Sequence, residues 1–505
     1  MSRTGQTLMR GATVRLGSLG ISLGLQMAML PFILHHLGDH LYGVWVVIGT
    51  LSSYYGLLDL GLSSAVTRFV SRELGRGDHA AASNYAAAGC RVFCLLGGFV
   101  ILLSVLVAIG GSQLIHQAED RRLFCWIALI VGCGLGLSFP TRAFDGVLVA
   151  HLRFDLLAVV RVVFSLVRAG LIYVLLTARG SILGLALINS LVSLAEGLST
   201  VGLARRVHGP LGSSWTVAQK GILKEMFGYA SYSCIAQVTD LLRFKLHPII
   251  ITVFMRFADV TPYAIADRLQ NVVVDICSAI LSMLTPVFSR QEAQGNLEAM
   301  RRSFFLAYKI SCYLGVLLLG LLSICAADFI ARWLGPGHDL VLTLLYLRVG
   351  GSLCGISQMP VVNLLFGTSE NRFYAFSNAL HAALTLILSI ILIRPFGLPG
   401  VVLAVVSVTA FVKLFIQAWA ACRVLKETLW SFHLGHTVPN LARPLPFLAA
   451  AWFLARLLLA PGYVRVGLFS AGVLALFVPY ILFVGFSKSE RELFLRSLVR
   501  CLTAS

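Results

Sequence analysis

Cationic side chains recur inside the long apolar runs of this sequence, where burying an unpaired charge costs several kcal/mol even after relaxation. Guanidinium groups bind phosphate oxygens through paired hydrogen bonds and a lysine acts as a compact point charge, so such cations suit a phosphorylated, anionic substrate. The positions that we predict to bind substrate are Arg243, Lys245, Arg268 and Arg348, followed by Arg161 and Arg168. The alternative for each of them is to extend toward a membrane surface.

Carboxylates at similar depth could bind a driving proton or sodium ion, because a desolvated carboxylate titrates closer to neutrality. The candidates for ion coupling are Asp59, Glu196, Asp240 and Asp275. Structural pairing with arginines is the alternative, for example between Asp240 and Arg243, and the coupling ion is left open. With Arg91 and Lys413 included, the deep cations outnumber these acids, which predicts a net positive interior.

Polar residues in several apolar runs repeat every three or four positions, which is the spacing of one face of an α-helix. The longest series runs from Arg268 through Asn271 and Asp275 to Thr285, and others begin at Ser52 and Asn189. A polar face of this kind does not suit contact with lipid. The hydroxyl and amide groups could nevertheless serve only to join neighbouring helices by hydrogen bonds.

The elements that must position these side chains are membrane-spanning helices. Of the 505 residues, 58% are hydrophobic and 12% are charged, and the mean hydropathy is +0.86, whereas an average soluble chain is about a quarter charged. We therefore predict an all-α polytopic membrane protein with about fourteen spans, each near the roughly 20 apolar residues that cross a bilayer. The predicted spans are 13–36, 42–66, 84–110, 123–149, 154–177, 181–204, 226–254, 262–288, 303–325, 340–366, 373–393, 398–421, 441–460 and 465–486.

The connections between these spans are too short to hold a separate catalytic domain. The longest polar connection runs from Arg205 to Glu225, whereas a folded domain needs about 50 residues or more. No Gly-x-x-x-x-Gly-Lys phosphate loop occurs, and the cysteines are scattered as apolar packing residues. His35, His36 and His40 lack the further ligands that a metal site needs. We expect a transporter rather than an enzyme, without cofactor or metal.

Lysine and arginine residues concentrate on alternate connections. With the amino terminus in the cytoplasm, roughly 24 of the 40 Lys and Arg residues fall on cytoplasmic ends and roughly 8 fall outside. Both termini are then cytoplasmic, because the number of spans is even. The net charge of +18 reflects this orientation and contact with anionic membrane lipids, and it requires no nucleic-acid partner.

The order of landmarks around the first three spans returns around the seventh to ninth. Pro31, LGDHLYG and Gly77 precede the third span, and Pro248, FADVTPYA and Gly295 precede the ninth. We infer two parallel six-helix lobes with Pro31 and Pro248 as candidate hinges, because a proline bends a helix. The predicted divisions are a first lobe at 1–206, a cytoplasmic linker at 207–225, a second lobe at 226–425, and two further spans with a basic tail at 426–505.

The run LPFILHHLGDHLYGVWVVIGTLSSYYGLLDLGLSSAVTRFVSRELGRGD resembles the amino-terminal signature of the polysaccharide transporter, or O-antigen flippase, family. Its superfamily also contains multidrug extruders and the lipid II flippase. The resemblance implies two V-shaped lobes around a central cavity in the bacterial inner membrane. It also implies that undecaprenyl-diphosphate-linked glycans move from the cytoplasmic to the periplasmic leaflet for cell-surface polysaccharide assembly. Other membrane proteins of glycan assembly are then possible partners.

Two other functions remain open. A multidrug or organic-cation antiporter of the same superfamily should have an acidic, aromatic cavity, so the excess of arginine argues against it. A membrane glycan polymerase or ligase commonly needs a long outer loop to hold its acceptor. No outer connection here exceeds about 15 residues, against a usual 2 to 8 for links between helices, which disfavours that enzyme.

Overall fold

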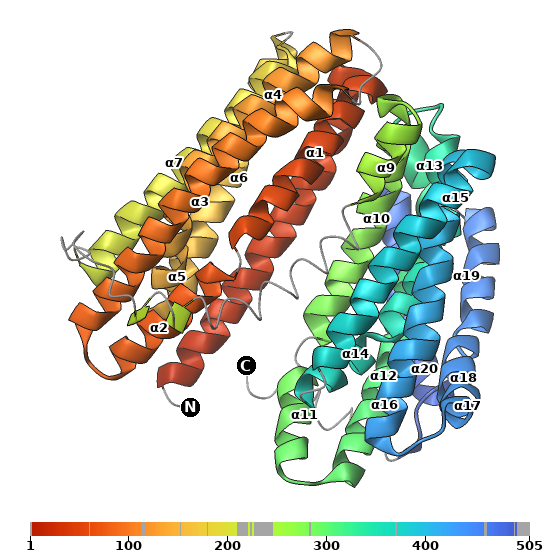
Figure 1. Cartoon of the computed structure of the whole chain (residues 1–505). Helices are drawn as coiled ribbons and strands as arrows, with labels where there is room; N and C mark the ends of the chain where they lie inside the picture. The colour runs from red at the N-terminus through yellow and green to blue at the C-terminus, as the bar shows by residue number, and fades with distance from the viewer. Residues whose placement is uncertain are drawn as a thin grey trace. The chain divides into compact units, whose positions relative to one another are not determined.

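The computed structural model describes residues 3–59, 61–113, 118–151, 153–178, 180–209, 221–222, 225–226, 246–281, 284–368, 371–458, 462–488 and 490–491. These residues form helices and the turns between them, and none of them lies in a strand (Figure 1). Within these described residues, nine helical stretches are long and apolar enough to cross a membrane. The predicted all-α, multi-span fold is confirmed.

Two of these stretches, Gly20–Gly56 and Phe373–Leu425, each contain two helices that meet at a non-helical glycine, so the number of stretches is lower than the number of predicted spans. Helix α1 (Arg3–Gly56) contains the first predicted span and the start of the second, and it kinks at Gly38, whose φ is 73°. Helix α15 (Asn371–Phe411) kinks in the same way at Gly397, whose φ is 59°. Of the predicted span 226–254, the structure describes residue 226 and the residues from 246 onward. Helix α9 (His247–Phe254) forms the end of this span.

The contacts divide the chain into two compact units, one of residues 1–261 and the other of residues 262–505. The predicted linker at 207–225 lies largely outside the described residues, so the predicted lobe boundary stays a prediction. Contacts with α1 explain why α9 and the start of α10 (Phe257–Leu281) group with the first unit. The Thr261 hydroxyl donates to the Asp39 carbonyl at 2.6 Å, and Gly43 lies directly against the Phe257 backbone.

The first unit is a bundle in which α4 contacts both α3 and α7, and α6 contacts both α1 and α7 (Figure 1). Besides α1 and α9, its elements are the 3₁₀ turn η1 (Leu57–Asp59), α2 (Leu62–Gly75), α3 (His79–Gln113), α4 (Ala118–Ser138), the 3₁₀ turn η2 (Phe139–Thr141), α5 (Arg142–Ala150), α6 (Phe154–Thr177) and α7 (Ile182–His208). Its buried core joins α2, α3 and α5 around Phe69, Phe93 and Phe144.

Small residues let α4 pack closely against both of its neighbours. A Cβ atom at Gly132 would collide with the Ser104 side chain of α3, and one at Gly134 would collide with the Ser190 side chain of α7. At Gly136 the obstacles are Ile101 and the Gly97 carbonyl of α3. Small residues at such positions are typical of helix pairs in membranes, because they allow the backbones to approach.

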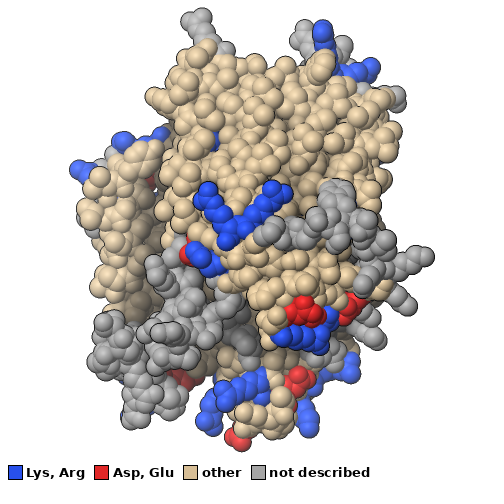
Figure 2. All heavy atoms as spheres, turned by 90° about the vertical axis from the view of Figure 1, so that its left-hand side faces the viewer, with Lys and Arg blue, Asp and Glu red and all other residues tan. Residues whose placement is uncertain are grey.

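Large apolar side chains cover the outward faces of α6 and α7. Leu166 and Val174 of α6 and Leu187, Leu191 and Leu198 of α7 are all exposed. Figure 2 shows a broad area without charged side chains in the upper half of one face of the molecule. An uncharged, apolar surface of this kind suits contact with hydrocarbon rather than with water.

The second unit is built around the long helix α12, which contacts α13, α14, α19 and α20. Its elements after α10 are α11 (Leu284–Ala293), α12 (Leu297–Trp333), α13 (Asp339–Ser357), α14 (Met359–Gly367), α15, the π-helix η3 (Val412–Gln417), α16 (Ala418–Leu425), α17 (Leu429–Phe432), the π-helix η4 (His433–Thr437), α18 (Val438–Ala442), α19 (Leu445–Leu458) and α20 (Tyr463–Val484). Phe304, Tyr308 and Phe432 are fully buried at its centre.

The repeated landmarks of the sequence adopt the same local structure in both units. Gly77 separates α2 from α3 with φ at 78°, and Gly295 separates α11 from α12 with φ at 63°. The next residue caps the long helix in each case, because Asp78 Oδ1 accepts from the Ala81 amide at 2.8 Å and Asn296 Oδ1 accepts from the Ala299 amide at 2.9 Å. Only glycine adopts such φ values without strain, so both turns require it.

The two candidate hinge prolines lie in different helical contexts. Helix α1 runs through Pro31, and its kink comes later, at Gly38. Pro248 lies in the first turn of α9, where the missing amide hydrogen removes no helical hydrogen bond. Their role as hinges stays a prediction.

Candidate functional site

An ion pair at membrane depth joins α6 to α7. Arg168 Nη2 lies 3.3 Å from Glu196 Oε2 and donates to the Ser193 hydroxyl at 3.2 Å. The two charged side chains are 30% and 28% exposed, so the pair is only partly shielded from its surroundings. The structure therefore brings together one predicted substrate-binding cation and one predicted coupling carboxylate.

Asp59 lies in the 3₁₀ turn before α2 and caps that helix. Its carboxylate accepts from the Ser63 amide at 2.9 Å and from the Ser63 hydroxyl at 2.7 Å. The Arg142 guanidinium of α5 lies 3.7 Å from the same carboxylate and 4.4 Å from the centre of the Phe139 ring. The predicted coupling residue Asp59 thus has a clear structural partner.

Asp145 of α5 links these two pairs into one charged cluster. It interacts electrostatically with Arg161 of α6, with Glu196, and with the Arg142–Asp59 pair. The cluster of the first unit therefore consists of Arg142, Arg161, Arg168, Asp59, Asp145 and Glu196. Its formal charges balance, because each of its guanidinium groups is matched by a carboxylate.

The sequence analysis did not single out Arg142 or Asp145. The sequence feature that could have identified these two residues is the segment Phe139-Pro-Thr-Arg-Ala-Phe-Asp145 inside the fourth predicted span. There an arginine and an aspartate lie three positions apart on one helix face. Two charged residues within one apolar run are typical of a functional position or of an ion pair within the membrane.

Arg161 differs from the other arginines of the cluster. Its side chain is exposed, and it makes neither a hydrogen bond nor an ion pair with any residue that the structure describes. Its position on α6 lies two helical turns before Arg168, on the same face of the helix. An exposed guanidinium beside the charged cluster can accept a new anionic partner without breaking an existing bond.

Arg348 of α13 is only 8% exposed and joins α13 to α10. Its Nε donates to Gln270 Oε1 at 2.6 Å, its Nη2 forms an ion pair with Asp267, and its guanidinium lies 5.0 Å from the centre of the Tyr263 ring. The Gln270 amide returns a hydrogen bond to the Arg348 carbonyl at 3.2 Å. Asp267, which the sequence analysis did not single out, is therefore the partner of this predicted cation.

The remaining predicted site residues are only partly placed. Arg268 is half-buried and Asp275 is exposed, both on α10. Three further predicted residues lie outside the described part of the chain: Arg243, Lys245 and Asp240. Their roles in binding or coupling stay predictions.

A second cationic side chain is buried in the second unit. Lys413, in the π-helix η3, is 4% exposed and donates to Gln417 Oε1 at 2.8 Å. Gln417 in turn donates to Ser377 Oγ at 2.9 Å and to Asn378 Oδ1 at 3.2 Å on α15. A wide π turn at this point is a recurrent feature of functional positions in helices.

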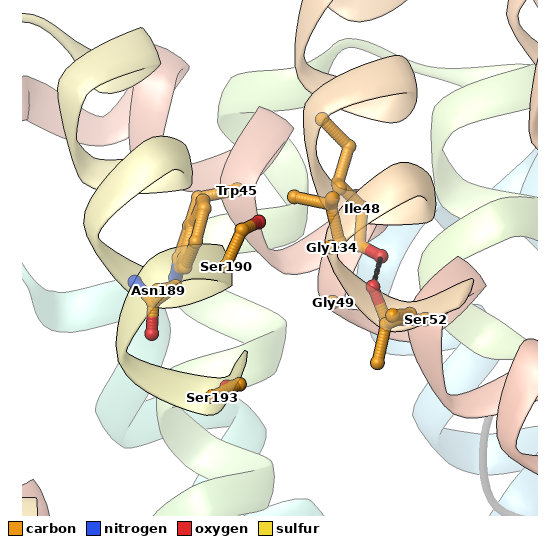
Figure 3. A pocket seen from close by; sticks show the side chains of 10 residues that line it. Trp45, Ile48, Gly49, Ser52, Gly134, Asn189, Ser190 and Ser193 are labelled. Carbon is orange, nitrogen blue, oxygen red and sulfur yellow. Dashed lines mark hydrogen bonds between the residues drawn. The ribbon is translucent and has the colours of Figure 1, made fainter. Parts of the chain in front are cut away.

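A cavity of about 220 Å³ lies inside the first unit between α1, α4 and α7 (Figure 3). The residues around it include Trp45, Gly49 and Ser52 of α1, Gly134 of α4, and Asn189 and Ser193 of α7. Ser193 also accepts the hydrogen bond from Arg168. The cavity therefore adjoins the charged cluster.

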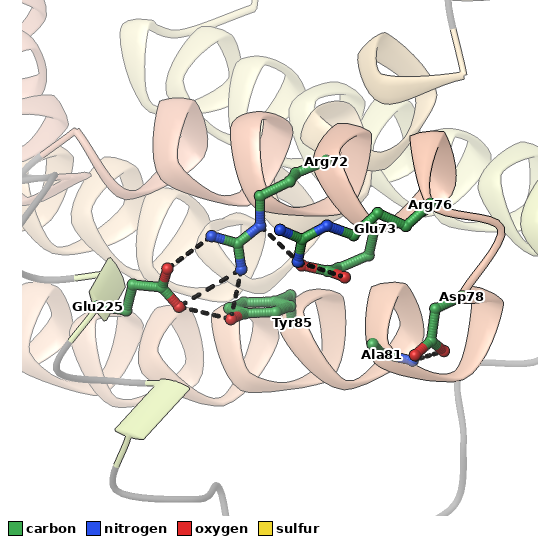
Figure 4. A network of polar contacts seen from close by, with 7 residues as sticks. All are labelled: Arg72, Glu73, Arg76, Asp78, Ala81, Tyr85 and Glu225. Carbon is green, nitrogen blue, oxygen red and sulfur yellow. Dashed lines mark hydrogen bonds and ion pairs between the residues drawn. The ribbon is translucent and has the colours of Figure 1, made fainter.

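A network of polar side chains lies at the turn between α2 and α3 (Figure 4). Arg72 Nη1 lies 2.6 Å from Glu225 Oε1, and the Tyr85 hydroxyl donates to Glu225 Oε2 at 2.6 Å. The Arg72 guanidinium, followed by the Tyr85 hydroxyl, holds the pKa of Glu225 below its ordinary value. Met226 beside it is fully buried in the core of the first unit, so the chain at 225–226 is fixed to that unit.

Solved structures with a similar fold are membrane transporters. The inward closed conformation of the lipid II flippase MurJ aligns over 97% of this chain and 100% of its own, with a TM-score of 0.72 and 13% identity. An inward-facing multidrug resistance transporter of the MATE family, in the MOP superfamily, aligns over 82% of this chain and 99% of its own, with a TM-score of 0.66 and 15% identity. The chain thus shares the multi-pass, all-α fold of these two proteins.

Sequence comparison identifies the family. The family model described as polysaccharide biosynthesis protein matches residues 8–292, which is more than half of the chain. The chain belongs to this family, as the amino-terminal signature predicted. The uncharacterized membrane protein EpsK of Bacillus subtilis (strain 168) is 23% identical over 397 residues, which cover 76% of this chain and 77% of EpsK.

Proposed function

We propose that this chain is a flippase that moves a polyprenyl-diphosphate-linked oligosaccharide across the bacterial inner membrane by alternating access. Transport runs from the cytoplasmic to the periplasmic leaflet for assembly of a cell-surface polysaccharide, with both termini in the cytoplasm. Membership of a polysaccharide biosynthesis family supports a glycan as the transported group. The likeness to the lipid II flippase supports the view that a fold of this kind can move a lipid-linked glycan.

The observation that carries the proposal is Arg161. A diphosphate loses its hydration when its lipid crosses the bilayer, and the loss has to be replaced by charge-assisted hydrogen bonds. Arg161 offers an exposed guanidinium without a bonded partner among the described residues. Asp145 and Glu196 interact with it electrostatically, and Arg168 pairs with Glu196.

The pairing of Arg168 with Glu196 offers a route to ion coupling. A proton taken up by Glu196 would remove the charge that holds Arg168, and Arg168 could then bind a second phosphate oxygen. Proton uptake by Glu196 and phosphate binding by Arg168 would thus favour each other. We propose proton coupling through Glu196 in this form, with sodium as the alternative ion and with Asp59, Asp240 and Asp275 as the other candidate carboxylates.

The test is a flipping assay with purified protein in liposomes. The probe is the lipid-linked oligosaccharide that accumulates in source cells after the gene for this chain is deleted. We expect Arg161→Ala to lower the initial flipping rate by about tenfold or more, since a charge-assisted hydrogen bond contributes about 1.5–3 kcal/mol. Arg161→Lys should retain part of the rate.

The matched control is Arg122→Ala, which removes an exposed arginine near the start of α4 and should leave the rate unchanged. Flipping by Arg161→Ala at the rate of the native protein would contradict the role of Arg161. Failure of the native protein to move the lipid-linked oligosaccharide, together with transport of organic cations, would contradict the proposed function itself.

A further inference from the structure

We infer that the cavity between α1, α4 and α7 binds one neutral sugar ring of the transported glycan. The inference rests on the proposed function and names a subsite for it. The size of the cavity, the chemistry of its lining and its contact with the charged cluster all suit such a ligand.

The size of the cavity suits one ring. Its volume is about 220 Å³, whereas a pocket for a drug-sized ligand usually measures about 300–1,000 Å³. It is also too large for a single water molecule, whose share of liquid volume is about 30 Å³. A ligand of intermediate size is therefore expected, and an oligosaccharide would place only one of its rings there.

The lining carries no charge. Around the cavity lie the indole of Trp45, the amide of Asn189, the hydroxyls of Ser52, Ser190 and Ser193, and apolar side chains or glycines (Figure 3). An organic cation would find no carboxylate there, and a phosphate would find no cation. A sugar ring instead presents an apolar face that packs on an aromatic ring and hydroxyl groups that bond to serine and asparagine.

The polar groups of the lining are arranged to accept hydrogen bonds. The Ser52 hydroxyl donates to the Ile48 carbonyl at 2.9 Å, and the Ser190 hydroxyl donates to the Ile130 carbonyl at 3.2 Å. The Asn189 amide nitrogen donates to the Leu185 carbonyl at 3.0 Å, and its oxygen accepts from no residue that the structure describes. The remaining lone pairs can accept from the hydroxyl groups of a sugar, and the Trp45 indole N–H and the second amide hydrogen of Asn189 can donate to its oxygens.

Two further features connect the cavity with transport. Gly49 lines the cavity without a side chain, and a Cβ atom at this position would meet nothing within 4 Å, although glycine inside a helix costs about 1 kcal/mol relative to alanine. Ser193 lines the cavity and accepts from Arg168 at 3.2 Å. A sugar bound here lies next to the cluster that we propose for the diphosphate.

The open position at Gly49 allows a steric test. Gly49→Leu would place a side chain in the cavity without touching the walls first, and leucine favours a helix more than glycine does, so the variant is expected to fold. The matched control is Gly24→Leu, at another position of α1 where a Cβ atom meets nothing within 4 Å. A second variant, Asn189→Leu, removes the amide and keeps the size of the side chain.

The measurements are flipping of the lipid-linked oligosaccharide described above, binding of the soluble glycan released from it by mild acid, and binding of undecaprenyl diphosphate without sugar. We expect Gly49→Leu and Asn189→Leu to lower flipping and binding of the soluble glycan by about tenfold, as loss of about 1.4 kcal/mol would do. Binding of undecaprenyl diphosphate should not change.

The other outcomes separate this inference from the proposed function. Unchanged flipping and glycan binding in Gly49→Leu would overturn the sugar subsite while the flippase remains. Weaker binding of undecaprenyl diphosphate in the same variant would assign the cavity to the lipid and would also overturn it. Absence of flipping in the native protein would overturn the proposed function first.

Discussion

Arg348 is almost fully buried, and Asp267, Gln270 and Tyr263 compensate its charge. A buried pair of this kind adds little net stability compared with apolar residues of the same size, because both charges have lost their water. Removal of one partner is different, since it leaves the other charge buried and unpaired. At the scale of single residues, Asp267 therefore offsets the free-energy cost of burying the charge of Arg348.

We predict that Asp267→Ala lowers the stability of the protein by about 3–5 kcal/mol. The thermal unfolding midpoint in detergent should fall by roughly 6–12 °C. The control is Asp275→Ala, which removes an exposed carboxylate of the same helix and should change the midpoint little. Recovery of stability in the double variant Asp267→Leu with Arg348→Met would support the pairing, and an unchanged midpoint in Asp267→Ala would contradict it.

The sequence predicted several charged residues of the site but not their partners. Arg168 and Glu196 were predicted on polar faces of their spans, and the structure pairs them. Asp145 and Asp267 were missed, because helical spacing tells which face a residue occupies and not which neighbouring helix packs against that face. With Asp145 included, the formal charges of the cluster in the first unit balance, and Asp267 offsets Arg348 in the second unit, so a net positive interior stays a prediction.

At the scale of the helices, the packing of α4 against its neighbours depends on three glycines. Gly132, Gly134 and Gly136 allow it to lie close to α3 and α7, and this approach also forms one wall of the cavity at Gly134. Helices in a membrane associate through such close packing because lipid removes the hydrophobic driving force between them.

We predict that Gly134→Val separates α4 from α7 and reduces the yield of folded, monodisperse protein. The cause is a collision with the Ser190 side chain that neither helix can relieve without moving. Size-exclusion chromatography and thermal unfolding measure the effect. Gly98→Val is the control, since a Cβ atom there meets nothing within 4 Å, and equal behaviour of the two variants would contradict the packing argument.

The helices themselves could be predicted from the sequence, but their connections and the cavity could not. Apolar runs gave the positions of the spans, but not the non-helical backbone at Gly38, where two helices of α1 meet without a separate loop. Ser52 and Asn189 lay in predicted polar series, yet Trp45 and Gly49 did not stand out. A cavity depends on which side chains fail to fill the space between helices, and periodicity carries no information on that.

At the scale of the whole chain, the segment after α7 is fixed to the first unit through Glu225 and Met226 (Figure 4). The carboxylate of Glu225 is held by Arg72 and Tyr85, and Met226 is inserted into the core. The predicted linker thus includes an anchored point at its carboxyl end.

We predict that Glu225→Gln weakens the attachment of residues 225–226 to the first unit and makes the side chain at position 226 more accessible to solvent. Met226→Cys, in a Cys94→Ala background, reports it through the rate of labelling by a maleimide, which should rise several-fold when Glu225→Gln is added. Because the pKa of Glu225 is lowered from 4.5, its charge is present at neutral pH and is lost only as the pH falls through that lowered pKa. The labelling rate relative to that of a small free thiol at the same pH should therefore be constant near neutrality and should rise in acid below about 4.5. Equal labelling of both forms would contradict the anchor.

The π-helix at Val412–Gln417 affects how this protein aligns with its relatives. A regular α-helix closes a turn with 3.6 residues, and a π turn accommodates an additional one. A relative with an unbroken α-helix here would need a one-residue gap to match the flanking segments. Deletion of Leu414 would restore the regular pitch and rotate the preceding residues by about 100° relative to α16. Lys413 would become the third residue before Gln417 instead of the fourth and would turn relative to the partners of Gln417 on α15, although no charge and no polar side chain had been altered.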